Sequence, residues 1–324
     1  SFGEPAQSML HYAPDAVIVA QARLMDFTLE TLEALGVPSY EETYSAARQA
    51  FPGVALGGGV LTNFTELNRN HPTPVLYDFI SHLTSAVVHE VDDRSVMETL
   101  QALPSLIGSV RAMAGGKTYR VGPSAIGMRY NPYGPSTYDN KTNIRMAFNQ
   151  QDPRHRALAG SAFTLGYVVR MAVGEVEAVS LGAAVGEFGL AYRKMAYAQP
   201  WYDDLGDGGG WVFPHCHISA AMAGAHAAEM LDVETSAPDR ILGLTYRTAT
   251  GWLLWFANLT REPQQVTISD PPVGTARIGR LDEDNFVTAV TEPAAFAADC
   301  GPSGDASKLD LGAYAVFQIE WEAA

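Results

Sequence analysis

The sequence predicts an α/β fold: the C-terminal part of a (β/α)8 TIM barrel, followed by an antiparallel β-sandwich. Up to about residue 237, short β-branched strands alternate with helices, which is typical of parallel β/α units whose sheet is covered on both faces. After Pro238 only short strands and turns are expected, which favours a sandwich. The alternation alone also fits a doubly wound sheet. A barrel followed by a sandwich is the common arrangement in carbohydrate-active enzymes, and we therefore favour the barrel.

Five strands are expected in the barrel part, each a short apolar run. They cover residues 15–21, 54–59, 75–81, 119–128 and 177–186. A barrel needs eight strands, so the first three are expected on a missing N-terminal barrel segment of the native chain. The five visible strands then become strands four to eight, in a barrel domain of residues 1–237 and a sandwich domain of residues 238–324.

Helix start signals separate these strands. Capping boxes of Ser39 with Glu42 and of Ser95 with Glu98 open helices over residues 40–51 and 96–115, and Pro104 should kink or divide the second. Asp152 at the N-cap and Pro153 at the first helical position start a helix over residues 154–172. The expected sandwich strands cover residues 240–247, 251–260, 264–270, 276–281, 286–291 and 312–321.

The charge and cysteine content exclude several classes of partner. A formal net charge of −15 argues against nucleic acid and against an anionic membrane surface, because both need clustered Lys and Arg. The two cysteines, Cys216 and Cys300, indicate neither a disulfide framework nor a zinc site. No cofactor is expected, the cytoplasm is the default location, and a homo-oligomer is left open. An acidic substrate or product would have to be held by local cations.

In a β/α barrel the chemistry lies in the loops that follow the strand carboxyl ends. Those loops are rich in polar side chains here. The candidates are Asn63, Glu66 and Asn68 after strand five, Asp78, His82, His89 and Asp92 at or after strand six, Arg129, Tyr130 and Asn131 after strand seven, and Glu187 after strand eight. The glycine triplet over residues 57–59 would let the backbone approach a ligand closely.

Each candidate also has a purely structural explanation. Asn63 and Glu66 could cap a short helix, and Asp92 could stabilise a helix N-terminus. Arg129 could form an internal salt bridge to Asp78 or Glu66. His82, His89 and Asp92 could bind a metal, although no paired helical spacing such as HExxH supports this. For His215 and His217, packing and helix capping are favoured.

Several motifs in fixed order resemble those of the D-apionate lactonase family. They are "GGG..TNFTELNRNHP", "VVHEVDDRSVMETLQALP", "GPSAIGMRYNPYG", "DPRHRALAGSAFTLGYV" and "VEAVSLGAAVGEFGLAYR". The resemblance covers most of residues 50–220 and, more loosely, the sandwich. It implies a sugar-acid lactonase that opens D-apionolactone in apiose breakdown, with a barrel similar to that of glycoside hydrolases and a native chain about twice this length. Departures at "VLTNF", "HLTSAVVHEV" and "AAVGEF" leave the substrate open.

The strand ends favour acyl chemistry over glycoside hydrolysis. Strand four ends in "AQARLM" without an Asn-Glu pair, and strand seven ends in "GMRYNP", with an arginine where a glycosidase nucleophile should be. No GxSxG elbow is present, so direct attack by water is expected. Our hypothesis makes Glu66 or His89 the general base and Arg129 and His82 the carbonyl or carboxylate stabilisers. Its other substrate contacts are Asn63, Asn68, Asp78, Asp92, Tyr130, Asn131 and Glu187.

Two other classes remain open. One is a glycoside hydrolase that uses Glu66 and Glu187, and the other is a carbohydrate-binding protein without catalysis.

Overall fold

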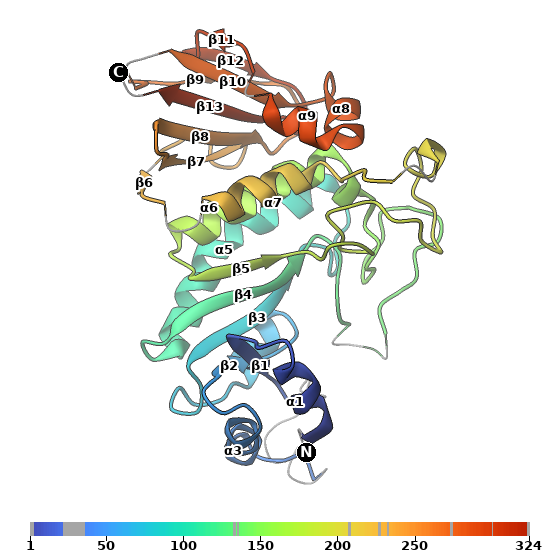
Figure 1. The fold of residues 1–324 in the computed structure, drawn as a ribbon, viewed down its shortest axis with the longest axis vertical. Coiled ribbons are helices and arrows are strands. Elements are labelled where there is room, and N and C mark those ends of the chain that lie inside the picture. The colour runs from blue at the N-terminus through green and yellow to red at the C-terminus, as the bar shows by residue number, and fades with distance from the viewer. Residues whose placement is uncertain are drawn as a thin grey trace.

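A computed structural model describes residues 3–21, 36–131, 134, 136–206, 209–225, 228–231, 233–272, 275–299 and 301–322. Strand four was expected to end in "AQARLM"; the last four of these residues, 22–25, lie outside this set, as does Cys300. The described chain forms a parallel sheet with its helices and, above them in Figure 1, an antiparallel β domain.

The parallel sheet has five strands in the order β1-β2-β3-β4-β5, and every neighbouring pair is parallel. The strands are β1 (Ala16–Val19), β2 (Ala55–Gly59), β3 (Phe79–Ser85), β4 (Thr118–Ala125) and β5 (Ala178–Leu181). Sequential order with helical crossovers is the arrangement of a TIM barrel, so this sheet is a partial barrel. The fold class expected from the sequence is confirmed.

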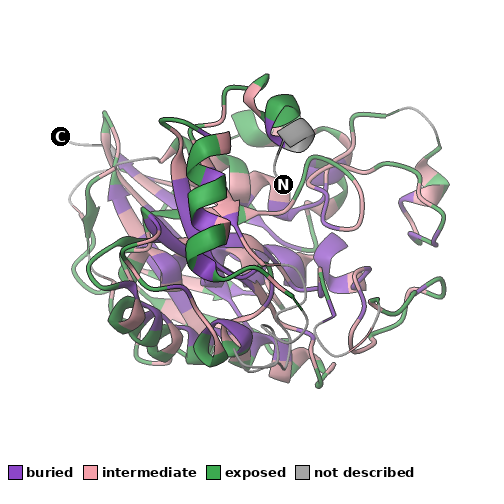
Figure 2. Ribbon diagram, turned by 90° about the horizontal axis from the view of Figure 1, so that it is seen from below, coloured by how far each residue is buried: buried purple, intermediate pink, exposed green. Residues whose placement is uncertain are grey.

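The helical elements are α1 (Gly3–Leu10), α3 (Tyr40–Ala50), α4 (Phe64–Arg69), α5 (Asp93–Ala114), the 3₁₀ turn η1 (Pro153–Arg156), α6 (Leu158–Val173), the 3₁₀ turn η2 (Asp203–Leu205) and α7 (His215–Gly224). Buried residues concentrate in the strands and on the helix faces that cover them (Figure 2). The long loops after β4 and β5 gather beyond the carboxyl ends of those strands, at the right of Figure 1.

The capping box of Ser39 and Glu42 is present in full, with both reciprocal hydrogen bonds. The second predicted capping box, Ser95 with Glu98, is not formed. Asp92 is the N-cap of α5, because its carboxylate accepts the N–H of Ser95, while Glu98 pairs with Arg94 instead. The helix is not divided at Pro104 but continues to Ala114.

Two further boundaries differ from expectation. Asp152 caps η1 rather than a long helix, and α6 starts separately at Leu158. The strand expected over residues 75–81 starts only at Phe79, because a turn bonding Leu76 N–H to the Thr73 carbonyl precedes it. The strand carboxyl end therefore moves to Ser85, and with it the edge at which a site can form.

The C-terminal domain consists of a six-stranded antiparallel sheet, order β11-β10-β13-β8-β7-β6, and a two-stranded sheet, β12-β9. The strands are β6 (Met230–Leu231), β7 (Ile241–Arg247), β8 (Gly251–Asn258), β9 (Gln264–Thr267), β10 (Ala276–Leu281), β11 (Ser303–Gly304), β12 (Lys308–Leu311) and β13 (Val316–Glu322). A small core that includes Phe256, Leu311 and Phe317 fills the space between the sheets. The prediction of a strand over residues 286–291 is wrong, because that segment is helix α8 (Phe286–Thr291). Helix α8 buries Ala289 and Val290 and is followed by α9 (Pro293–Ala298).

Helix α6 joins the two domains. It lies between the parallel sheet and strands β7 and β8 of the C-terminal sheet (Figure 1), and one hydrophobic core includes residues of all three. Residue 166 is a glycine, which lets α6 approach α5 and the C-terminal domain closely. A Cβ atom there would lie 2.7 Å from Leu100 and 3.2 Å from Leu259. The domain boundary predicted at residues 237/238 stays a prediction; β6, which precedes it, already pairs with β7.

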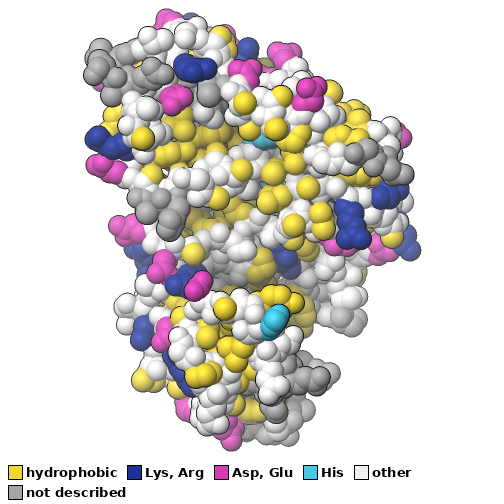
Figure 3. All heavy atoms as spheres, viewed as in Figure 1, with side chains coloured by type: hydrophobic (Ala, Val, Ile, Leu, Met, Phe, Trp, Pro, Cys, Tyr) yellow, Lys and Arg dark blue, Asp and Glu magenta, His cyan; other side chains and the backbone are white. Residues whose placement is uncertain are grey.

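The surface carries the negative charge of the sequence without a concentrated basic region on the face drawn in Figure 3. Lys and Arg side chains lie mainly along its margins, interspersed with Asp and Glu. Among the described helices, none is long and apolar enough to cross a bilayer.

Candidate functional site

The glycine triplet of β2 packs against the next strand. Cβ atoms at Gly57 and Gly58 would lie 2.4 Å from the Phe79 ring and 2.2 Å from the Tyr77 ring, and one at Gly59 would lie 1.9 Å from the Ser81 carbonyl. The space that the missing side chains leave is therefore filled by protein. The expectation that these glycines make room for a ligand is wrong, because strand packing accounts for all three.

Helix α4 directly follows β2 and carries Glu66 at its third position. Asn63 is the N-cap residue, but its side chain makes no capping hydrogen bond, so the expected cap is only half right. Glu66 is 1% exposed, and its Oε1 lies 3.8 Å from Nη1 of Arg69. A buried carboxylate at a strand carboxyl end is suited to proton transfer. Asn68 lies exposed on the same helix.

Two candidates lie away from this edge. Asp78 precedes β3 at the amino end of the sheet, where its carboxylate accepts the Leu56 N–H at 2.8 Å and pairs with Arg48 at 2.7 Å. The Arg48 hydrogen bond lowers the pKa of Asp78. The expected substrate contact is thus corrected to a strand-end cap, because the strand begins four residues later than predicted.

His82 is the second candidate that lies away from this edge. Alternation along β3 puts it on the same side as Ile80, in the core that faces the helices. Its Nε2 accepts from the Tyr119 hydroxyl at 2.6 Å and its Nδ1 donates to the Leu83 carbonyl at 2.7 Å. Burial lowers the pKa of His82 to about 4. Both nitrogens are engaged inside the protein, so the predicted role as carbonyl stabiliser is corrected to a core role.

His89 and Asp92 follow β3 at the carboxyl edge. His89 is exposed and contacts the Phe148 ring edge-on, with 5.2 Å between ring centroids, so the loops after β3 and β4 meet there. Asp92 is exposed, and hydrogen bonding from Ser95 lowers the pKa of its carboxyl group. The structural explanation of Asp92 as a helix cap is confirmed. Among the described residues no cluster of three or more His, Cys, Asp or Glu side chains could hold a metal.

Arg129 lies in the loop after β4, over the ring of Phe188 from the loop after β5. Its Cζ is 4.0 Å from the ring centroid. Nε and Nη2 are buried, and within the described residues neither has a hydrogen-bond partner. The salt bridge to Asp78 or Glu66 is not formed, and burial lowers the pKa of the guanidinium. A half-buried cation with two unpaired donors is suited to bind a carboxylate or a polarised carbonyl.

The other candidates flank Arg129. Tyr130 is 46% exposed, whereas Asn131 is buried and donates to the Ser136 carbonyl at 2.9 Å within its own loop. Glu187 is half-buried beside Phe188, and its charge contributes to raising the pKa of Tyr197, after the larger effect of burial. Glu66, His89, Arg129 and Glu187 thus all follow the carboxyl ends of β2 to β5.

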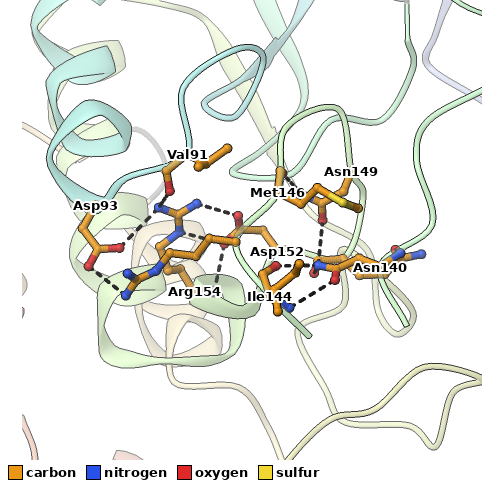
Figure 4. Close-up of polar contacts among 10 residues, drawn as sticks. Val91, Asp93, Asn140, Ile144, Met146, Asn149, Asp152 and Arg154 are labelled. Carbon is orange, nitrogen blue, oxygen red and sulfur yellow. Dashed lines mark hydrogen bonds and ion pairs between the residues drawn. The ribbon is translucent and has the colours of Figure 1, made fainter. Parts of the chain in front are cut away.

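A buried polar network fixes the loop that carries Arg129 (Figure 4). Arg154 binds both carboxylate oxygens of Asp152, at 2.9 and 2.7 Å, and also reaches the Val91 carbonyl and Asp93. Oδ1 of Asn140 accepts a hydrogen bond from the Ile144 N–H, and its Nδ2 donates to the carbonyls of Ile144 and Gln151. The loops after β3 and β4 are therefore locked together.

Sequence reasoning missed His155, which follows this network and is 8% exposed. Its Nε2 donates to the Gly189 carbonyl at 2.9 Å, and its ring lies 4.2 Å from that of His215. Burial lowers the pKa of His155 to about 4, and the charges of Arg156 and Arg129 contribute. The signal was the run Arg154-His155-Arg156 directly after Asp152 and Pro153, which was assigned to a helix. The packing role expected for His215 is confirmed, because its ring contacts those of His155 and Phe213.

Comparison with known families gives matches along both domains. A model described as the TIM barrel domain of D-apionate lactonase matches residues 6–227, and one described as its C-terminal immunoglobulin-like domain matches residues 238–319. The D-apionate lactonase of Brucella anthropi is 39% identical over 258 residues, which are 80% of this chain and 40% of that protein.

Solved structures with the same fold are much more distant in sequence. An α-L-arabinofuranosidase from Thermotoga maritima is 12% identical, with a TM-score of 0.50 over 94% of this chain and 66% of that one. A family 51 α-L-arabinofuranosidase from Bifidobacterium longum is 13% identical, with a TM-score of 0.50 over 89% and 64% of the two chains. At these identities the likeness shows the fold alone.

Proposed function

Because the chain belongs to the D-apionate lactonase family, we propose that it carries the site of a lactonase that opens a sugar-acid lactone of the D-apionolactone type. The chain spans 40% of the length of the curated relative, so the activity and substrate of the whole protein are part of this proposal. The substrate is a small sugar lactone and the product a sugar acid.

The observation that carries the proposal is the half-buried side chain of Arg129, whose Nε and Nη2 are buried and have no hydrogen-bond partner within the described residues. Attack on a lactone carbonyl concentrates negative charge on its oxygen, and the product is a carboxylate. Donors placed beforehand at that oxygen stabilise the transition state, and they are more effective where water is excluded. Arg129 supplies two such donors, backed by the Phe188 ring.

In the reaction, a general base takes a proton from water while the water oxygen adds to the carbonyl carbon. The tetrahedral intermediate then collapses, the ring C–O bond breaks, and the departing alkoxide takes the proton back from the base. Glu66, a buried carboxylate, and His89, an exposed imidazole, are the two candidates for this base. The proposed hydroxyl contacts are Asn63, Asn68, Asp92, Tyr130, Asn131 and Glu187.

The test is a pH-stat assay of the full-length protein on D-apionolactone and a panel of aldonolactones, with aryl glycosides assayed in parallel. We expect acid release from a lactone and no reducing sugar from a glycoside. Release of reducing sugar without lactone opening would instead support a glycoside hydrolase that uses Glu66 and Glu187. Calorimetric sugar binding without any turnover would overturn the proposal in favour of a binding protein.

A further inference from the structure

We propose that His155 is a positioning residue that holds the segment Glu187-Phe188-Gly189 beneath Arg129, so that the guanidinium keeps its orientation toward the substrate. This inference rests on the proposed function. It concerns how the site is supported rather than which groups touch the lactone.

The backbone of His155 is itself immobilised. Residue 155 lies in η1, which begins with Asp152 accepting the Arg154 N–H at 2.9 Å. The Arg154 side chain then binds Asp152 with two hydrogen bonds and donates to the Val91 carbonyl at 2.8 Å. A buried two-point ion pair fixes geometry more strictly than a single contact. The imidazole of His155 therefore projects from a rigid support.

From that support His155 reaches across to the loop after β5. Its Nε2 lies 2.9 Å from the Gly189 carbonyl oxygen, which can only accept, so Nε2 carries the proton. The same loop is tied back at two more points, since Ala183 N–H donates to the Phe188 carbonyl at 2.7 Å and Gly189 N–H to the Gly186 carbonyl at 3.0 Å. These three bonds fix the backbone on both sides of the Phe188 side chain.

Phe188 in turn forms the floor under the guanidinium, 4.0 Å from Cζ of Arg129. Arg129 has no other side-chain partner for Nε and Nη2 within the described ranges, so the ring is the contact that defines its position. A shift of Phe188 would therefore move the donors. Misplacement by about 1 Å can cost about 100-fold in rate.

His215 holds the imidazole of His155 in place from the other side. The two rings are 4.2 Å apart, and both line a small, partly open pocket of about 20 Å³ with Ser124 and Tyr167. The carbonyls of His155 and Gly189 lie near the His215 ring but outside hydrogen-bond geometry. Packing against a neutral ring thus restricts His155 without competing for its proton.

The charges around His155 keep it neutral. Burial is the largest effect on its pKa, and Arg156 and Arg129 act in the same direction, whereas Asp152 opposes them. A neutral imidazole with its proton on Nε2 is the form that can anchor Gly189, while a cation there would face two guanidinium groups.

Two amide substitutions separate the anchoring role from simple loss of a histidine. In His155→Gln the amide nitrogen occupies about the position of Nε2 and can still donate to the Gly189 carbonyl. The asparagine side chain of His155→Asn is one methylene shorter and cannot reach that carbonyl. We expect His155→Asn to lower kcat/KM for lactone opening by about 10- to 100-fold and His155→Gln to recover most of it. His217→Asn is the matched control, because His217 likewise donates Nε2 to a carbonyl, that of Ala289 at 2.8 Å, outside the site.

A double-mutant cycle shows whether His155 acts through Arg129. With Arg129→Met already present, adding His155→Asn should change the remaining rate by less than about threefold. An equal loss in both backgrounds, equal activity of the Asn and Gln variants, or the same loss in His217→Asn would overturn the inference.

Hydrogen–deuterium exchange of residues 183–190 gives a readout that does not depend on turnover. We expect faster exchange in His155→Asn than in wild type or His217→Asn. Unchanged exchange would refute the positioning role even if lactones are opened. Absence of lactone opening by the wild type would instead refute the proposed function, whatever the exchange result.

Discussion

The guanidinium of Arg129 lies over the ring of Phe188, with 4.0 Å between Cζ and the ring centroid. The two residues come from the loops after β4 and β5, so this contact joins neighbouring strand ends at one edge of the sheet. The chain has a net charge of −15, yet the half-buried guanidinium of Arg129 has no carboxylate partner within the described residues. We propose that it marks the place where the anionic product is held.

Replacing Arg129 by Met should lower kcat/KM for lactone opening by about 100- to 1,000-fold, because two donors to the developing oxyanion are lost. Arg129→Lys should recover only part of this, since a lysine cannot present two donors in one plane. Pre-steady-state and steady-state rates check the prediction. Arg48→Met, which removes an arginine at the opposite edge, is the control and should keep full activity.

Replacing Phe188 by Leu should lower kcat/KM by about 10- to 100-fold, because the ring that defines the position of the Arg129 guanidinium is lost and misplacement by about 1 Å can cost about 100-fold. The measurement is kcat/KM on the same lactone. Trp252→Leu removes a similar contact, with Arg247 at 4.5 Å, from the C-terminal domain and should leave the rate unchanged. Equal effects of the two substitutions would show that the contact has no special role at the site.

Glu66→Gln keeps the shape of a side chain that is 1% exposed and removes its charge. If Glu66 is the general base, lactone opening should fall by at least about 100-fold while thermal unfolding shifts by only a few degrees. His89→Asn tests the alternative base in the same assay. Glu98→Gln, at an exposed pair on α5, is the control. Full activity in both Glu66→Gln and His89→Asn would remove these residues from the mechanism.

Acid should destabilise the protein from about pH 6.5 downward. Burial lowers the pKa of His82 and of His155 to about 4 and that of His215 well below its ordinary value. Below pH 6.5 the unfolded chain binds protons that the folded chain does not, so stability falls with pH until the folded-state pKa is reached. Each histidine contributes up to about 1.4 kcal/mol per pH unit.

Urea unfolding at pH 7, 6 and 5 measures this slope. Carboxylates with a lowered pKa, such as Asp78 and Glu177, also stabilise the folded protein. Their contribution to the free energy of unfolding is lost at lower pH, because it disappears only as they protonate. A free energy of unfolding that stays constant between pH 7 and pH 5 would contradict the assignment of buried neutral histidines.

Asp152→Asn should destabilise the protein by about 3–5 kcal/mol, because it leaves the buried Arg154 guanidinium without its main partner. Chemical denaturation checks this. Asp139→Asn breaks the exposed pair with Lys141 and should cost less than about 1 kcal/mol. Comparable losses for the two would mean that the network in Figure 4 does not hold the loop.

The architecture could be predicted because it depends on patterns that repeat along the chain. Apolar runs alternating with capped helices indicated the parallel sheet, and the full capping box at Ser39 was correct in detail. Residues 286–291 were misassigned because β-branched side chains favour strands, while burial of Ala289 and Val290 against the rest of the fold outweighs that preference.

The candidate site was harder to predict, since it depends on register and on contacts between distant segments. A strand starting four residues later moved Asp78 to the opposite edge, and alternation along β3 put His82 among the helices. The glycines at positions 57–59 were predicted to make room for a ligand, but they accommodate the rings of Phe79 and Tyr77 and the Ser81 carbonyl. His155 could not be found from spacing, because its partner Gly189 is 34 residues away.

The most direct test of the proposed role of Arg129 is a crystal structure of the full-length protein with the sugar-acid product bound. We expect the product carboxylate at about 2.7–2.9 Å from Nε and Nη2 of Arg129, with its hydroxyl groups toward Glu187 and Tyr130. A carboxylate bound elsewhere, with Arg129 still stacked on Phe188 and contacting no ligand, would contradict it.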